Sequence, residues 1–226
     1  MLHKKSFPNE SKAYRQKRDR LLKEEIALRR HLEKVAVLRR KLPLGGRVKE
    51  DYVFEEMVKG EVKETRLSSL FKRGKDTLIV YSWMFPNAEG LPCPACTSIL
   101  DGLNGSSPHV NDRVNFVAIC KAPIKEAERW RESRGWKNLR MLSSEKNTFK
   151  NDYFAEGENK DQLPILSVFR KTPKGIYHFW SSELFFVKPD AAQDMRHVDF
   201  VWPIWSLFDV TPEGRGKDWS PKNSYE

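Results

Sequence analysis

Cys93 and Cys96, separated by a Pro-Ala dipeptide, form the feature that most limits how this chain folds. They follow an unbroken run of β-branched, aliphatic and aromatic residues, Thr77–Phe85, which predicts a central strand covered on both faces. The stretch Thr97–Leu103 predicts a helix directly after them. A motif between a strand and a helix places its first sulfur at the helix N-terminus, where unpaired N–H groups and the helix dipole favour a thiolate. We therefore expect Cys93 to be the nucleophile and Cys96, one turn later, to be the thiol that resolves a mixed disulfide.

The segments that follow continue the alternation of strands and helices. Val114–Cys120 predicts a second buried strand, and Ile124–Trp136 predicts a crossover helix. Leu163–Phe169 and Gly175–Trp180 flank a short basic turn and predict an antiparallel hairpin, with a further helix and loop after Asp190. We expect an α/β protein with a thioredoxin-like fold, in which helices cover both faces of a mixed central sheet.

The basic charge of the chain is concentrated in its first 42 residues. They hold 14 Lys and Arg against 5 Asp and Glu, which accounts for nine of the ten net positive charges. Gly and Pro are absent from Asn9 to Leu42, and apolar residues recur every seven positions, so one long N-terminal amphipathic helix is predicted. The apolar positions are Tyr14, Leu21, Leu28, Val35 and Leu42. Pro43 and the glycines after it end the helix. We expect two domains: a basic N-terminal helix and linker, 1–46, and a thioredoxin-like domain with a C-terminal extension, 47–226.

The basic helix and an aromatic C-terminal segment are candidate interaction surfaces. The helix carries no nucleic-acid recognition motif, so nucleic acid is a disfavoured partner, and an acidic partner or a second copy fits better. The segment Phe200–Trp205 could also form the interface of a homodimer. The alternative to an enzyme is therefore a redox-inert thioredoxin-fold interaction module that binds an acidic partner through the basic helix.

Cysteine usage and hydropathy exclude two classes of protein. Three cysteines are too few, and odd in number, for a disulfide-stapled secreted scaffold. No apolar stretch follows the basic N-terminus, and no run approaches the roughly 18 apolar residues of a membrane span. We expect a cytoplasmic protein without a membrane partner.

Zinc binding is an alternative use of the cysteines. Cys93, Cys96, His109 and Cys120 form a nominal set of four ligands. Zinc is disfavoured because Cys120 lies inside an apolar strand and no second paired motif occurs, so Cys120 is better explained as a buried core thiol. We expect no metal and no cofactor, and a protein or small-molecule thiol or disulfide as the substrate.

Three residues are predicted to contact the substrate: Trp83, Leu163 and Pro164. In this order of elements Pro164 opens the strand that runs beside the cysteine turn, where thioredoxin folds place a cis-proline. We expect the Leu163–Pro164 bond to be cis. A proline there exposes the backbone of Leu163 to an extended chain and has no N–H of its own.

Short motifs spread over nearly the whole chain carry a family resemblance. In order they are Arg39-Arg40-Lys41-Leu42-Pro43, Asp51-Tyr52-Val53-Phe54, Tyr81-Ser82-Trp83-Met84-Phe85, Cys93-Pro94-Ala95-Cys96, Arg134-Gly135-Trp136, Leu166-Ser167-Val168-Phe169 and Asp209-Val210-Thr211-Pro212-Glu213-Gly214-Arg215. The chain thereby resembles a bacterial thioredoxin-like family catalogued as a domain of unknown function, DUF899. The resemblance implies a thioredoxin-like fold and dithiol-disulfide oxidoreductase activity, with the direction of electron flow left open. Peroxidases of this fold need a Thr three residues before their cysteine, and Gly90 stands at that position.

Overall fold

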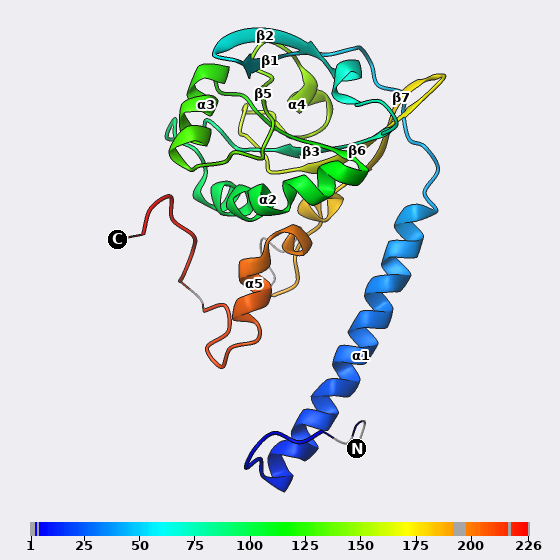
Figure 1. Cartoon of the computed structure of the whole chain (residues 1–226), viewed down its shortest axis with the longest axis vertical. Coiled ribbons are helices and arrows are strands. Elements are labelled where there is room, and N and C mark those ends of the chain that lie inside the picture. The colour runs from blue at the N-terminus through cyan, green and yellow to red at the C-terminus, as the bar shows by residue number, and fades with distance from the viewer. Residues whose placement is uncertain (1–2, 4, 192–197, 217, 226) are drawn as a thin grey trace. The chain divides into compact units, whose positions relative to one another are not determined.

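The computed structural model describes residues 3, 5–191, 198–216 and 218–225. The chain divides into two compact units, Met1–Pro43 and Leu44–Glu226 (Figure 1). The first holds one long helix, and the second holds the sheet and the cysteine motif.

The N-terminal unit is built on helix α1, Lys12–Arg40, as the heptad pattern predicted. Ser11 caps it, because its Oγ accepts the backbone N–H of Tyr14 at 3.0 Å and so satisfies a donor that the helix leaves free. The apolar side chains of the stripe are largely exposed, among them Leu21 and Leu28 at 52% and 58%. Among the described residues, no helix is both long and apolar enough to cross a membrane.

The second unit is built on a mixed sheet of seven strands in the order β2-β1-β5-β4-β3-β6-β7. Strands β3, β4 and β5 run parallel, whereas β6 pairs antiparallel with β3 and β7 pairs antiparallel with β6. The strands are β1 Val53–Val58, β2 Glu61–Arg66, β3 Thr77–Ser82, β4 Asn115–Cys120, β5 Met141–Ser143, β6 Leu166–Thr172 and β7 Gly175–Ser181. The helices of this unit are η1 Leu67–Leu70, α2 Pro94–Arg113, α3 Ile124–Ser133, α4 Phe149–Asp152, η2 Glu183–Phe186, η3 Asp199–Val201 and α5 Pro203–Phe208.

Alternation along the central strand β3 divides the core into two clusters. Leu78 and Val80 face one side of the sheet, and Tyr81 faces the other. The cysteine-side cluster, under α2 and α3, consists of Tyr81, Trp83, Phe85, Cys93, Cys96, Ile99, Leu100, Phe116, Ala118, Cys120, Ala122, Ile124, Ala127, Trp136, Leu139, Met141, Leu166, Val198 and Trp202. The far-side cluster, under η1 and α4, consists of Tyr52, Phe54, Leu67, Leu70, Phe71, Leu78, Val80, Val117, Ile119, Leu142, Phe149 and Phe169.

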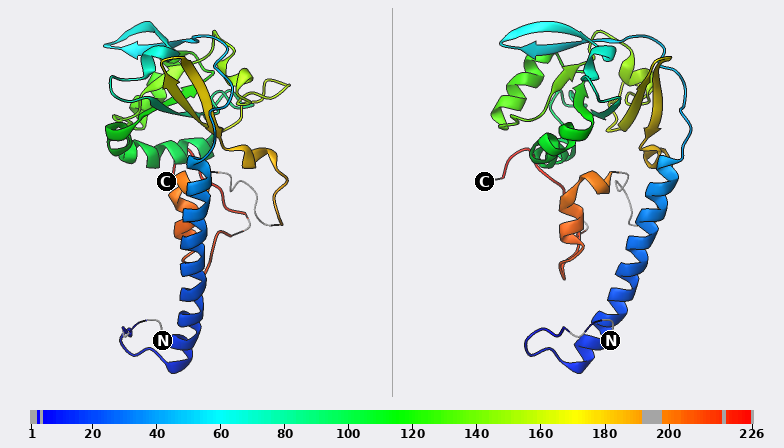
Figure 2. Two further views of the ribbon diagram at one scale, coloured as in Figure 1. Left: turned by 90° about the vertical axis from the view of Figure 1, so that its right-hand side faces the viewer. Right: turned by 45° about the vertical axis from the view of Figure 1, so that its right-hand side comes forward.

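The order and direction of the strands confirm the predicted fold class, a thioredoxin-like α/β fold with helices on both faces of a mixed sheet. The two crossover helices share one face, because the path β3-α2-β4-α3-β5 steps across the sheet in a single direction with one handedness. On the opposite face, the short helices η1 and α4 contribute residues to the far-side cluster (Figure 2).

Helix α2 is longer than the predicted span Thr97–Leu103, because it begins at Pro94 and ends at Arg113. It continues through Pro108, whose missing N–H leaves the carbonyl of Asn104 without its helical donor. Asn138 supplies a donor in its place, because its Nδ2 donates to the Asn104 carbonyl at 3.2 Å. A contact from beyond the helix therefore supports a stretch for which the sequence predicted no helix.

Strands β2 and β5 and helix α4 are absent from the sequence-based prediction. Strand β2 reads Glu-Val-Lys-Glu-Thr-Arg, without the apolar alternation that marks a half-buried strand, and it forms only by pairing with β1. The ion pair between Arg140 and Glu56, 2.7 Å apart, joins β1 to the residue that precedes β5. Tertiary pairing thus decides this edge of the sheet.

The C-terminal segment returns to the outer side of α2. Trp202, 2% exposed, links η3 to α5, and its Nε1 donates to the Ser98 hydroxyl on α2 at 3.1 Å. The helix and loop predicted after Asp190 therefore include η3 and α5, while residues 192–197 lie outside the described part. This segment completes the cysteine-side cluster.

Candidate active site

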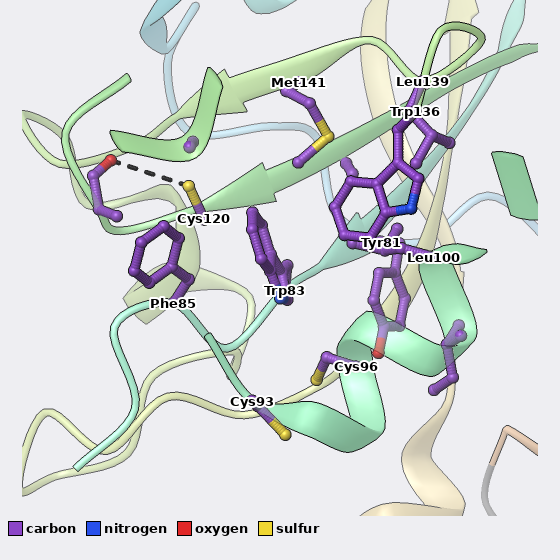
Figure 3. Close-up of a cluster of buried hydrophobic side chains, with 14 of the residues drawn as sticks. Tyr81, Trp83, Phe85, Cys93, Cys96, Leu100, Cys120, Trp136, Leu139 and Met141 are labelled. Carbon is purple, nitrogen blue, oxygen red and sulfur yellow. Dashed lines mark hydrogen bonds between the residues drawn. The ribbon is translucent and has the colours of Figure 1, made fainter. Parts of the chain in front are cut away.

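The cysteine motif lies where the chain passes from β3 into α2 (Figure 3). Strand β3 ends at Ser82, three residues earlier than the apolar run suggested. Cys93 is the N-cap of α2, its N–H donates to the Met84 carbonyl at 3.0 Å, and its own carbonyl accepts the N–H of Thr97 at 2.9 Å. Both Cys93 and Cys96 are free thiols, 9% and 1% exposed.

The surroundings of Cys93 favour its thiolate. A hydrogen bond from the Cys96 thiol has the largest effect, and the backbone N–H groups of Cys96 and Ala95 add to it. Together they outweigh burial and lower the pKa of Cys93 to about 7. These backbone donors exist because the first turn of a helix leaves its N–H groups unpaired.

Cys96 shows the opposite behaviour. Burial raises its pKa well above the usual range for a thiol, and the neighbouring Cys93 raises it further. The nearby Tyr81 hydroxyl and the backbone of Met84 act on the pKa of Cys96 in the other direction. The two sulfurs therefore differ as a nucleophile and a resolving thiol should, with the accessible one ionising first.

Several hydrogen bonds hold the loop before Cys93 in place. The Phe85 carbonyl accepts the N–H groups of Lys121 and Ala122 at 2.9 and 2.8 Å, which ties the loop to the end of β4. From the C-terminal segment, the Asn223 Nδ2 donates to the Pro92 carbonyl at 2.9 Å. The nucleophile thus follows a backbone that is fixed from two sides.

Trp83 lies beneath the motif rather than on the surface. Its side chain is fully buried, and its ring centroid lies 5.0 Å from that of Phe85 and 5.6 Å from that of Trp136. A substrate would reach Trp83 only after the Cys93 loop had moved, so its predicted contact with substrate stays a prediction.

The prediction of a cis bond between Leu163 and Pro164 is wrong, because among the described residues the cis bond is Phe85–Pro86. Trans is the default for X-Pro bonds. The backbone of Leu163 is also occupied: its N–H donates to the Ala155 carbonyl at 2.9 Å, and its carbonyl accepts the N–H of Ile165 at 3.1 Å. Pro164 itself is buried beside the end of β3, where the Ser82 N–H donates to the Ile165 carbonyl. Strand β6 begins at Leu166, so Pro164 precedes the strand rather than opening it.

Cys120 is a buried core thiol, as its apolar strand predicted. It is fully buried, and its Sγ donates weakly to the carbonyls of Ala122 and Leu142 at 3.7 and 3.8 Å. Burial raises its pKa to about 12. Within the described residues, no three His, Cys, Asp or Glu side chains gather as a metal site would require.

Two buried polar residues near the cysteines were missed by sequence reasoning. Tyr81 is fully buried, and its hydroxyl points toward the start of α2 beside Cys96 (Figure 3). Lys150 is also fully buried, its Nζ donates to the Trp83 carbonyl at 2.9 Å, and burial lowers its pKa to about 8. The alternation of β3 could have placed Tyr81 on the side of α2, whereas no local pattern marks Lys150.

Comparison by sequence finds one family model, described as "Bacterial protein of unknown function (DUF899)", which matches residues 4–226. No curated protein matches the chain.

Among solved structures, the mitochondrial 2-Cys peroxiredoxin from Plasmodium falciparum is 17% identical, with a TM-score of 0.48 over 74% of this chain and 95% of that one. Peroxidoxin BcpB from Mycobacterium tuberculosis is 16% identical, with a TM-score of 0.48 over 72% of this chain and 95% of that one. The exposed lipoprotein thioredoxin Etrx1 from Streptococcus pneumoniae is 17% identical, with a TM-score of 0.41 over 66% of this chain and 98% of that one.

Proposed function

The chain belongs to the DUF899 family of bacterial proteins, and from that premise we propose that it is a thiol-disulfide oxidoreductase whose redox pair is Cys93 and Cys96. The observation that carries the proposal is the contrast between the two sulfurs. One is an N-cap thiol with a lowered pKa, and the other is a buried thiol with a raised pKa that hydrogen-bonds to the first. This asymmetry supports sequential attack, in which the Cys93 thiolate attacks the substrate disulfide and Cys96 then attacks Cys93 to form the intramolecular disulfide.

The reaction proceeds through two exchanges. The Cys93 thiolate attacks one sulfur of a substrate disulfide, a new S–S bond forms, the substrate S–S bond breaks, and the leaving thiolate takes the electron pair and a solvent proton. Cys96 then loses its proton to solvent and attacks the Cys93 sulfur, which forms the Cys93–Cys96 disulfide and releases the second substrate thiol. Two electrons pass to the substrate, and a dithiol reductant restores the pair. The same steps run in reverse oxidise a substrate dithiol.

The substrate is proposed as a protein or small-molecule disulfide rather than a peroxide. Gly90, which has a positive φ of 76°, lies three residues before the nucleophile and offers no hydroxyl to hold a peroxide. The predicted substrate contacts at Leu163 and Pro164 remain part of this proposal.

Equilibration in glutathione redox buffers tests the function. We expect the wild type to show a two-electron midpoint, and Cys120→Ser to retain it because Cys120 is fully buried. Cys93→Ser should abolish exchange with a disulfide substrate such as insulin, and Cys96→Ser should accumulate a mixed disulfide on Cys93. Insulin reduction that survives Cys93→Ser, or wild-type thiols that never form an intramolecular disulfide, would refute the proposal.

A redox-inert interaction module is the second candidate, and the exposed basic helix α1 favours it. In that case an acidic partner, or a second copy in a homodimer, binds through α1, and the binding weakens as salt is raised. Removal of residues 1–43 would then abolish the binding, and neither the full chain nor the shortened one would show a glutathione midpoint. A cytoplasmic location stays a prediction, to be checked by fractionation.

A further inference from the structure

Tyr81 presents a buried hydroxyl that the fold itself does not use. Its side chain is 0% exposed, and its oxygen has no geometrically defined hydrogen-bond partner among the described residues. Leaving a phenol oxygen unpaired away from water costs about 1–3 kcal/mol. A phenylalanine would fill the same space in the core without that cost, so packing alone does not explain the hydroxyl.

The hydroxyl lies beside the sulfur of Cys96. Tyr81 is on β3 and Cys96 is in the first turn of α2, and Figure 3 shows the phenol oxygen directed toward that turn. The two groups act on each other: the hydroxyl lowers the pKa of Cys96, while burial first, and then Cys96, raise the pKa of Tyr81 well above its usual range. Because the pKa of the Tyr81 phenol is raised above its usual range, the phenol keeps its proton near neutral pH and can act as a donor.

We propose that Tyr81 is a positioning residue for the resolving step, in which its O–H donates to the Cys96 sulfur and stabilises the thiolate that must form in a buried site. The inference rests on the proposed function. The proton of Cys96 leaves to solvent, the Cys93–Cys96 bond forms as the mixed disulfide breaks, and Tyr81 keeps its own proton throughout. In the reverse direction, the same donor stabilises Cys96 as the leaving group when an incoming thiolate attacks Cys93.

Of the groups that face Cys96, Tyr81 and one backbone N–H are the ones that can donate a hydrogen bond to its thiolate. Cys93, at the start of α2, is bonded to the substrate during resolution and carries no charge. From α4, the buried Lys150 interacts electrostatically with Cys96 but donates its hydrogen bond to the Trp83 carbonyl, and Met84 supplies a backbone hydrogen bond to Cys96. Tyr81 is thus the side-chain donor to this sulfur among the described residues, and a hydrogen bond to a charged group is stronger than one between neutral groups.

Reaction with dithiobis(nitrobenzoate) separates the two steps, because each releases one coloured thiolate. Cys93 attack releases the first, and Cys96 attack on the mixed disulfide releases the second. In Tyr81→Phe we expect the first phase to stay unchanged and the second to slow by roughly 10- to 100-fold, with its pH profile moved to higher pH. The matched control is Tyr153→Phe, which removes a phenol oxygen from a ring packed on the far-side cluster and should change neither phase.

Fluorotyrosine provides a second measurement that keeps the ring. It makes the phenol a stronger donor, so the second phase should quicken in the wild type and not in Tyr81→Phe. An unchanged second phase in Tyr81→Phe, or equal slowing of both phases together with a lower melting temperature, would overturn the role of Tyr81 and leave the dithiol function standing. Release of a single thiolate by the wild type would instead overturn the dithiol function itself.

Discussion

The two faces of the sheet differ in how they treat polar atoms. In the far-side cluster, the single polar side chain among its buried members is Tyr52, and its hydroxyl donates to the Asp152 carboxylate at 2.7 Å. In the cysteine-side cluster, the Tyr81 hydroxyl and the Trp83 indole N–H have no hydrogen-bond partner among the described residues. The same holds for the indole N–H groups of Trp130 and Trp205, which are partly buried and pack against this cluster. The far-side hydroxyl is thus satisfied, whereas the cluster that contains the three thiols leaves several polar atoms unpartnered within the described part of the chain.

This difference indicates that the far-side cluster contributes mainly to stability, whereas the cysteine-side cluster contains the groups that would carry out chemistry. The far-side cluster is a set of closely spaced aromatic rings, with Phe149 5.3 Å from Phe54 and 5.6 Å from Phe169. The cysteine-side cluster holds the paired sulfurs, and the buried Lys150, from α4, donates to the backbone carbonyl of its member Trp83; a buried charge of this kind costs free energy. Proteins tolerate such groups where a function uses them. The following predictions test this contrast.

The largest effect on stability is expected on the far side. Phe54→Ala removes a side chain that is 1% exposed and should lower the free energy of unfolding by about 3–5 kcal/mol. The redox midpoint of the folded molecules should not change. Urea denaturation and glutathione titration measure the two quantities, and Phe54→Leu provides a milder variant for the titration. A shifted midpoint in Phe54→Leu would contradict the separation of the two faces.

Lys150→Met should stabilise the protein by up to about 3 kcal/mol, at about 1.36 kcal/mol per pKa unit. The folded-state pKa of Lys150 is about 8, against 10.5 for the ordinary side chain, so the unfolded chain binds more protons between these pH values. The penalty is complete below pH 8 and fades as pH rises to 10.5. The Trp83 carbonyl keeps a donor in the variant, the N–H of Phe85 at 3.1 Å.

Urea denaturation of Lys150→Met and wild type across this pH range measures the difference. Lys146→Met serves as the control, because Lys146 lies on the surface and pairs with Glu55. A gain in Lys150→Met that did not shrink between pH 8 and 10.5 would mean that Lys150 is not buried as an unfavourable charge.

The alkylation rate of Cys93 should follow its lowered pKa. With iodoacetamide, we expect the rate to rise to half its maximum near pH 7, because only the thiolate reacts. Cys96→Ala removes the largest stabilising contact and should move that midpoint upward, toward the value of an ordinary thiol. Mass spectrometry of the Cys93 peptide gives the rates. Identical midpoints in both proteins would show that Cys96 does not tune Cys93.

The smallest effect is expected from the C-terminal segment. Asn223→Ala removes the hydrogen bond to the Pro92 carbonyl and should lower stability by about 1 kcal/mol, with a modest increase in the alkylation rate of Cys93. Lys222→Ala, a change at an exposed neighbour, is the control. Equal rates in Asn223→Ala and Lys222→Ala would separate this segment from access to the nucleophile.

The sequence predicted the features that depend on neighbouring residues. The apolar run of β3, the N-cap position of Cys93 and the hairpin β6-β7 all follow from local patterns. The prediction was wrong or silent where a distant contact decided the outcome. Asn138 supplies a hydrogen bond to α2 at Pro108, β5 pairs with β1 although the two strands are far apart in the sequence, and the N–H of Leu163 donates to the Ala155 carbonyl.

The sequence by itself determined that a thiol begins a helix and that a second thiol follows one turn later, because the donors that lower the pKa of Cys93 belong to Cys96 and Ala95. Only the tertiary structure decided what surrounds Cys96. The Tyr81 hydroxyl acts on Cys96 from β3, and burial, which excludes water, has the largest effect on the pKa of both residues. Electrostatic interactions strengthen as the local dielectric falls, so the character of the resolving thiol is a property of the assembled core.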